Sequence, residues 1–409
     1  MRLDNFRYAL LITVALGASD AFSAVGFTDI DASATAHAIT GCATFGMAAY
    51  TTGAYTGALT SAVANTDATA YLSTTLPCSM TTNFGTAAAP VLLSVLNTGD
   101  LTLNANNFYK PVTGIDSSLD IGSLRFYAPG KVRIDTAVPV FNNGSYMEFL
   151  SDRMVDFVTT ALDFAGDMVI AAGKTLYINV DTGKTATISG KIRGGGRVVK
   201  KGGGDLFLTN ALNSYGGGET AEAGLLYLPA VVLAADNTSA IAIPDRIVKS
   251  FNVPNGASYK LSGAISGLGY FRKLGGGVAD LLGNNIGFMG KLIVGDGTNR
   301  AGTILAGHIN ALGSNTVETD LVISANANAT LKFAVSATTK RPLSLGDNLI
   351  VEVGSTTSGK TTTAAVATFD GIISETGGAR SITKTGAGQF VLNRLNTFSG
   401  GLAVNRPTA

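Results

Sequence analysis

Residues 369–401 read FDGIISETGGARSITKTGAGQFVLNRLNTFSGG, and this stretch carries the clearest fold signal in the chain. An apolar-x-Gly-x-Ile start leads into Lys-x-Gly-x-Gly, a short aliphatic run, and an aromatic residue near a glycine. The same skeleton occurs in residues 188–218 (ISGKIRGGGRVVKKGGGDLFLTNALNSYGGG) and 261–290 (LSGAISGLGYFRKLGGGVADLLGNNIGFMG). The lysine precedes the aromatic by 15, 15 and 14 residues, a spacing that chance rarely maintains. Three copies of one unit predict a repeat architecture.

Each copy contributes the same set of recurring positions: one lysine, two glycines and one aromatic residue. They are Lys200, Gly202, Gly204 and Tyr215; Lys273, Gly275, Gly277 and Phe288; and Lys384, Gly386, Gly388 and Phe398. We expect structural roles for all of them. Glycines let the chain turn, aromatics pack in a ladder along the axis, and lysines lie on solvated faces of the coils.

Short runs between the copies alternate apolar and polar residues, as in 101–105 (LTLNA), 176–180 (LYINV) and 331–335 (LKFAV). Apolar residues at i, i+2 and i+4 share one face of a strand. The stretch 151–172 is ambiguous, because its apolar spacing also suits a helix. Such a unit cannot bury its apolar face alone, so neighbouring coils must stack. The sequence therefore predicts an all-β fold, a parallel β-helix or solenoid over residues 89–409.

The repeat skeleton resembles the passenger-associated repeat of bacterial autotransporters, roughly L-x-G-x-I-x-G-x-G-x-L-x-K-x-G-x-G-x-L-x-L-x-G-x-N-x-Y-x-G-G. Besides the lysines, glycines and aromatics named above, the matches include Leu206, Leu208, Asn213 and Gly217 in the first copy and Leu392, Asn396, Gly400 and Gly401 in the third. The resemblance covers about a quarter of the chain directly. It implies a right-handed parallel β-helix, exported to the cell surface or beyond, with no catalytic residue.

Members of that family usually continue into a membrane-embedded translocator barrel. Residues 1–409 end with Pro407, Thr408 and Ala409, just after the third copy. We therefore expect either a passenger fragment or a protein that leaves the cell by another route. End-to-end self-association fits the second case, because the open ends of a β-helix are templates for strand pairing.

The N-terminal part of the chain has a different composition from the repeats. Residues 1–24 resemble a signal peptide, since Tyr8 to Ala18 is apolar but short for a membrane span. Residues 25–88 are rich in Ala, Thr and Gly, and we expect them to cap the solenoid. Cys42 and Cys78 are a candidate disulfide in an oxidising compartment. These features predict an extracellular or cell-surface protein whose mature chain has no integral membrane span.

Charge patterning argues against nucleic acid as a partner. The formal net charge is +1, and no Lys or Arg occurs between Arg7 and Lys110. A phosphate-binding surface needs cations, which this quarter of the chain lacks.

Several chemical motifs have simpler structural explanations. Residues 354–361 (GSTTSGKT) match the P-loop pattern, but the following TTTAAVATF favours a strand where a nucleotide site needs a helix. Asp205 after three glycines lacks the tandem copies of calcium-binding repeats. Two histidines, His37 and His308, are too few to indicate a triad. Carboxylates are the groups with which a polysaccharide-active β-helix would cleave its substrate, and the candidates are Asp280, Asp296 and Asp370.

These observations predict a secreted or cell-surface structural or adhesive solenoid, without a catalytic site, cofactor or metal. The sequence does not specify its ligand. A self-assembling subunit of an extracellular filament or surface layer is the first alternative, and a polysaccharide-active β-helix enzyme is the second.

Overall fold

The computed structural model describes most of the chain from residue 123 onward and short strands before it. The described residues are 37–39, 69–72, 78–79, 92–95, 100–103, 107–109, 123–134, 139–142, 144–232, 236–295, 297–298, 301–314, 319–324, 326–358 and 361–405. They contain strands and turns and no helix. The chain divides into two compact units, residues 1–226 and 227–409, which are described in turn.

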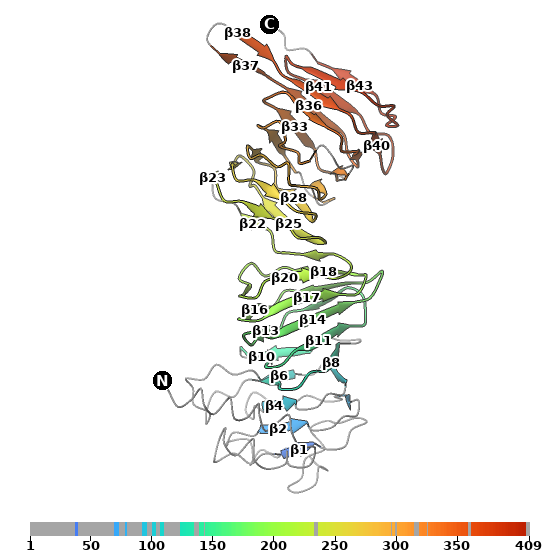
Figure 1. Cartoon of the computed structure of the whole chain (residues 1–409). Helices are drawn as coiled ribbons and strands as arrows, with labels where there is room; N and C mark the ends of the chain where they lie inside the picture. Colours follow the sequence, from blue (N-terminus) through green and yellow to red (C-terminus); the bar gives the residue numbers. More distant parts are fainter. Residues whose placement is uncertain are drawn as a thin grey trace. The chain divides into compact units, whose positions relative to one another are not determined.

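The first unit contains three sheets and one strand pair (Figure 1). In strand order, one sheet holds β1 (His37–Ile39), β2 (Thr69–Leu72), β4 (Leu92–Val95), β7 (Leu124–Phe126), β10 (Tyr146–Phe149), β13 (Asp167–Ile170), β16 (Ile192–Gly194) and β19 (Ser214–Tyr215). The next holds β3 (Cys78–Ser79), β5 (Leu101–Leu103), β8 (Lys131–Ile134), β11 (Arg153–Phe157), β14 (Thr175–Val180), β17 (Arg197–Lys201) and β20 (Glu219–Ala221). The third includes β12 (Leu162–Phe164), β15 (Thr185–Ile188), β18 (Asp205–Leu208) and β21 (Leu226–Tyr227), and β6 (Asn107–Tyr109) pairs with β9 (Val140–Asn142).

Successive coils of this unit pair in parallel, strand on equivalent strand, which defines a β-solenoid. Alternation of side chains explains why these segments form walls around a core. In β14, Leu176, Ile178 and Val180 are buried while the residues between them are partly exposed. Aromatic rings continue the stacking from coil to coil, as Phe126 lies on Phe149 with centroids 5.2 Å apart.

The second unit repeats this architecture. One set of neighbouring strands is β25 (Ile247–Asn252), β28 (Tyr270–Leu274), β30 (Leu292–Val294), β32 (Leu321–Ile323), β35 (Leu343–Leu345) and β40 (Ile373–Glu375), with β22 (Val231–Val232) beside β25. A second is β23 (Asp236–Asn237), β26 (Ser258–Leu261), β29 (Val278–Leu281), β31 (Thr303–Ala306), β33 (Ala329–Phe333), β36 (Leu349–Val353), β41 (Ile382–Thr385) and β43 (Leu402–Val404). The smaller sets are β34 (Ala337–Thr339) with β39 (Val366–Phe369) and β42 (Gln389–Leu392), β24 (Ile241–Ala242) with β27 (Ile265–Ser266), and the antiparallel hairpin β37 (Ser355–Ser358) and β38 (Thr361–Ala364).

The predicted fold class is confirmed: the structure is an all-β parallel solenoid. The ambiguous stretch 151–172 forms strands β11, β12 and β13 and no helix. Tertiary stacking decides this, because each of these strands pairs with a strand of the next coil. The expected signal peptide at 1–24 lies outside the described residues, as does most of 25–88, so that boundary stays a prediction.

Candidate functional site

The three repeat lysines lie inside the solenoid wall, which corrects the expectation of solvated lysines. Lys200 on β17 and Lys273 on β28 are 0% exposed, and Lys384 on β41 is 7% exposed. Each shares its strand face with a buried aliphatic or aromatic residue two positions earlier: Val198, Phe271 and Ile382. Because strand side chains alternate, the lysine must point the same way as that residue, into the core.

Register places each lysine in a column of residues on the inward-facing side of the strands. Lys200 pairs with Ile178 on one side and Ala221 on the other. Lys273 lies between Phe251 and Val294. Lys384 lies between Val351 and Val404. The aliphatic stem of lysine therefore fills a core position, and its ammonium extends to the turn at the end of the strand.

Backbone carbonyls surround the ammonium groups of the first two lysines. Lys200 Nζ donates to the carbonyls of Lys201 (2.5 Å) and Gly202 (2.6 Å) in its own coil and of Ala223 (3.3 Å) in the next. Lys273 Nζ donates to Gly275 (2.5 Å) and Gly277 (2.7 Å) in its own coil and to Ala301 in the next. Three donors meet three acceptors, so each ammonium joins two successive coils without a carboxylate partner. We call this arrangement the lysine cage.

Glycine after the lysine is required by this turn. Gly202, Gly275 and Gly386 have φ of +73°, +75° and +78°, in the left-handed region that other residues rarely adopt. A Cβ at Gly275 would lie 2.3 Å from the carbonyl oxygen of Val253 in the preceding coil, and equivalent contacts occur at the other two. The Lys-x-Gly pattern therefore recurs because this arrangement requires both the lysine and the glycine.

Burial lowers the pKa of the Lys200 and Lys273 ammonium groups to about 8, with nearby Asp205 opposing the shift at Lys200. Burial also lowers the pKa of Lys384. Removal from water disfavours the charged form of an amine, which accounts for the direction. With pKa values of about 8, Lys200 and Lys273 still carry a proton for most of the time at neutral pH.

A second recurring contact involves asparagine, a repeat position for which no role was predicted. The side-chain oxygens of Asn213, Asn285 and Asn396 accept the backbone N–H of an isoleucine in the preceding coil, at 2.8, 2.8 and 2.7 Å. Those isoleucines are Ile192, Ile265 and Ile373, each from the Gly-x-Ile start of a copy. The asparagine thus pairs a strand's first amide at a coil corner. Both elements were visible in the repeat pattern, but their pairing needed the coil geometry.

The repeat aromatics differ from the expected axial ladder. Tyr215 and Phe398 are partly exposed, and Phe288 is buried under the guanidinium of Arg341, which lies 5.2 Å from the ring centroid. Burial, with Glu219 nearby, raises the pKa of Tyr215. Among the described residues the stacked rings are other phenylalanines, such as Phe251 on Phe271 at 4.7 Å.

The P-loop-like segment forms a β-hairpin. Residues 355–358 and 361–364 pair antiparallel as β37 and β38. A phosphate-binding loop would be followed by a helix, whereas residues 361–364 form a strand. Ala365 N donates to Gly354 O at 3.0 Å and closes the hairpin at its base. Val353 and Ala365 on either side of the hairpin are buried in the wall.

The remaining candidates have local contacts or lie outside the described residues. Asp205 Oδ1 accepts the amide of Leu225, and Asp280 Oδ2 accepts the hydroxyl of Ser258 at 3.3 Å. Asp370 Oδ1 accepts Asn393 Nδ2 at 2.6 Å. Asp296 and Cys42 are outside the described residues, as is the side chain of Cys78, so the disulfide stays a prediction. Within the described part of the chain, no group of three or more His, Cys, Asp and Glu is placed to hold a metal ion.

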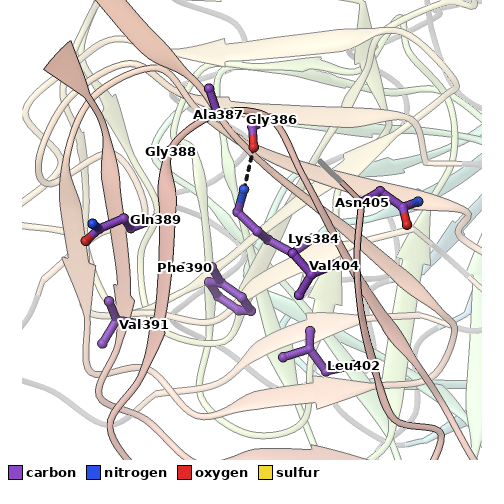
Figure 2. Close-up of a pocket in the computed structure, with 10 residues that line it drawn as sticks. All are labelled: Lys384, Gly386, Ala387, Gly388, Gln389, Phe390, Val391, Leu402, Val404 and Asn405. Atoms are coloured by element: carbon purple, nitrogen blue, oxygen red, sulfur yellow. Dashed lines mark hydrogen bonds between the residues drawn. The ribbon is translucent and has the colours of Figure 1, made fainter. Parts of the chain in front are cut away.

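The third lysine borders a pocket (Figure 2). Lys384 Nζ donates to Thr385 O at 3.0 Å and Gly386 O at 2.5 Å. Figure 2 shows Phe390, Leu402 and Val404 beneath the lysine and Gln389 and Asn405 on either side. The pocket therefore combines an ammonium, apolar side chains and strand edges from β42 and β43.

No family model, curated protein or solved structure matches the chain. The described residues also include no helix long and apolar enough to span a bilayer.

Proposed function

We propose that this protein is a structural or adhesive β-solenoid of the cell surface or extracellular space, similar in architecture to an autotransporter passenger. The proposal rests on one observation: Lys200, Lys273 and the recurring asparagines bond to the backbone of neighbouring coils, and the recurring glycines lie against it. Residues that recur for stacking support a scaffold function.

The outer faces of the walls support the same proposal. Polar side chains from successive coils pair along them, as Asn179 Nδ2 donates to Asp156 Oδ1 at 2.7 Å and Lys201 Nζ lies 2.9 Å from Glu222 Oε2. Exposed ladders of this kind present a regular polar surface, over which binding would be distributed. The described contacts of Asp280 and Asp370 do not favour a polysaccharide-cleaving enzyme over a scaffold.

Export and surface presentation form the direct test. The 409-residue chain, expressed in a Gram-negative host, is expected in the extracellular or surface fraction, and deletion of residues 1–24 is expected to retain it inside. On cells that carry the intact chain, the solenoid should resist digestion by added protease. These cells should also adhere to surfaces or host cells more strongly than cells without the chain. Retention inside the cell with residues 1–24 present would contradict the proposal.

The alternative, a self-assembling extracellular subunit, is favoured by a separate feature. The pocket beside Lys384 is flanked by strands that have, in the described part of the chain, a pairing partner on one side only. Electron microscopy of the purified chain separates discrete particles from indefinite fibres.

A further inference from the structure

The turn between β25 and β26 contains the pair Asn255 and Gly256. Both residues are exposed, and Ala257 N donates to Pro254 O at 3.0 Å to close the turn. Gly256 has a φ of +78°, and a Cβ added there would meet nothing within 4 Å. The turn therefore leaves the peptide bond between Asn255 and Gly256 in contact with solvent.

Two groups of this turn that can react with each other have no hydrogen-bond partner among the described residues. The amide N–H of Gly256 reaches no acceptor, and the carboxamide of Asn255 neither donates nor accepts. Asn255 Oδ1 lies against Gly276 of the next coil, where a Cβ would be only 2.5 Å from it. Because glycine has no Cβ, the next coil leaves the carboxamide room to rotate.

Asparagines at the coil corners are held more firmly. The side-chain oxygens of Asn213, Asn285 and Asn396 each accept a backbone N–H of the preceding coil. Such a hydrogen bond must break before a neighbouring nitrogen can approach the carboxamide carbon. Each of the three is also followed by a residue that has a Cβ, which hinders that approach. Asn255 therefore differs from them in both respects.

We propose that Asn255 is a site of spontaneous deamidation. The nitrogen of Gly256 attacks Cγ of Asn255, so that an N–Cγ bond forms and the Cγ–Nδ2 bond breaks. Nδ2 takes up the amide proton and leaves as ammonia. Water then opens the resulting succinimide ring: cleavage of the N–Cγ bond gives aspartate, and cleavage of the bond between that nitrogen and the main-chain carbonyl carbon gives isoaspartate. The reaction needs only water.

Either product adds a negative charge to an outer turn, and isoaspartate also lengthens the main chain by one carbon atom. The added atom would lie between Pro254 and Ala257, which close the turn. Ala257 O also accepts Val278 N of the next coil at 2.8 Å. Isoaspartate at this position should therefore weaken a contact between two coils and lower the stability of the fold.

An equivalent turn in the first unit supplies a matched variant. Residues 181–184 are closed by the same backbone hydrogen bond, with Gly183 at a φ of +78° and Thr182 in the place of Asn255. Thr182 Oγ1 lies against Gly203 of the next coil, as the carboxamide does in the second unit. Asn255→Thr should therefore preserve the turn while it removes the reactive group.

The test is peptide mapping by mass spectrometry on the folded full chain, aged at mildly alkaline pH beside a peptide of residues 250–260. Deamidation adds about 1 Da, and an isoaspartyl methyltransferase labels isoaspartate. In the folded chain, Asn255 should convert within about tenfold of its rate in the peptide, because an exposed turn needs little local opening. It should convert at least about tenfold faster than Asn213, Asn285 and Asn396.

Urea denaturation of the aged chains measures the consequence. Wild type and Asn255→Thr should be equally folded before ageing by circular dichroism, and only the wild type should shift to a lower urea midpoint afterwards. Asn143, which also precedes a glycine, is present in both chains, so the comparison isolates Asn255.

Conversion of Asn255 more than about tenfold slower than in the peptide, or no faster than at the corner asparagines, would overturn the inference. Equal loss of stability in both aged chains would overturn the predicted effect on the coils. The reaction requires neither export nor a ligand, so these outcomes do not depend on the proposed function.

Discussion

At the residue scale, the buried lysine is the most informative feature of this chain. Lysine is rarely buried without a charged partner, yet Lys200 and Lys273 are fully covered and their ammonium groups contact carbonyl oxygens. Carbonyl lone pairs substitute for water around the charge, while the four-carbon stem packs in the core. The hydrogen bonds of the cage thus offset the cost of removing the ammonium from water, and they join two coils.

Removing one ammonium should destabilise the fold. Lys273→Met preserves the packed stem but leaves the carbonyls of Gly275, Gly277 and Ala301 without their donor. We expect the free energy of unfolding to fall by about 2 kcal/mol in urea denaturation at pH 7. Lys260→Met, on the exposed face of β26, is the control and should change it by less than about 0.5 kcal/mol. Equal effects of the two substitutions would contradict the cage.

The lowered pKa values make stability depend on pH in a defined direction. The folded amines of Lys200 and Lys273 titrate at about 8, below the 10.5 of an unfolded lysine. Between these values the unfolded chain binds more protons, so the contribution of each amine to the free energy of unfolding rises with pH. It is complete above pH 10.5 and lost as pH falls through 8.

Urea denaturation at pH 7 and pH 9.5 checks this prediction. The free energy of unfolding of the wild type minus that of Lys273→Met should grow by about 2 kcal/mol between the two pH values, since the pH rises about 1.5 units above the folded pKa of about 8. Other groups that titrate in this range contribute equally to both chains and cancel in the difference. A difference that shrinks or stays constant would show that burial does not lower the pKa of the Lys273 amine.

At the element scale, the turn after the lysine limits which residues can follow it. Gly275 and Gly256 have nearly the same φ, +75° and +78°, but a Cβ at Gly256 would meet nothing within 4 Å. Gly256→Ala therefore measures the left-handed backbone alone and should cost about 1 kcal/mol. Gly275→Ala adds the clash with Val253 O and Asn252 Oδ1, and should cost at least about 3 kcal/mol. Thermal unfolding of both variants gives the comparison, and equal costs would rule out the contact.

The asparagine at the coil corner gives a second prediction at this scale. Asn285 accepts the amide of Ile265 and donates to Ala311 O at 2.8 Å, and it is buried. Asn285→Ala should lower the free energy of unfolding by about 2 kcal/mol, because it leaves both backbone groups without a partner. Its neighbour Asn284 is exposed, and Asn284→Ala should have little effect when measured in the same urea titration.

The sequence predicted the strands and their stacking better than it predicted the polar contacts inside the solenoid. Alternation identified strands such as 176–180, and the repeats required coils that stack. Lys273 follows Phe271 by two residues, so alternation alone indicates that both side chains point into the core. The prediction of an exposed lysine instead followed the general preference of lysine for the surface, and it was wrong. The partner of Asn285 could not be predicted, since Ile265 lies 20 residues away and only the coil length brings it near.

At the scale of the whole molecule, stacking of neighbouring coils should determine which backbone amides are protected from hydrogen exchange. An amide that bonds to a neighbouring strand should exchange slowly, and one on an unpaired side should exchange fast. Hydrogen exchange followed at single amides should be slow for Ala403, whose N–H faces β41, and fast for Leu402 and Val404 in dilute solution. Slow exchange of the Leu402 and Val404 amides would contradict this pairing of β43, which among the described strands pairs with β41 alone.

The hairpin β37–β38 shows how the solenoid tolerates variation in coil length. Gly354 and Ala365 are hydrogen-bonded to each other at its base, so the chain leaves the wall and returns at nearly the same point. Residues between them can lengthen, shorten or be exchanged while Val353 and Ala365 keep their places. This site is accordingly suited to grafting a foreign epitope or affinity tag, with the parallel walls as the display support.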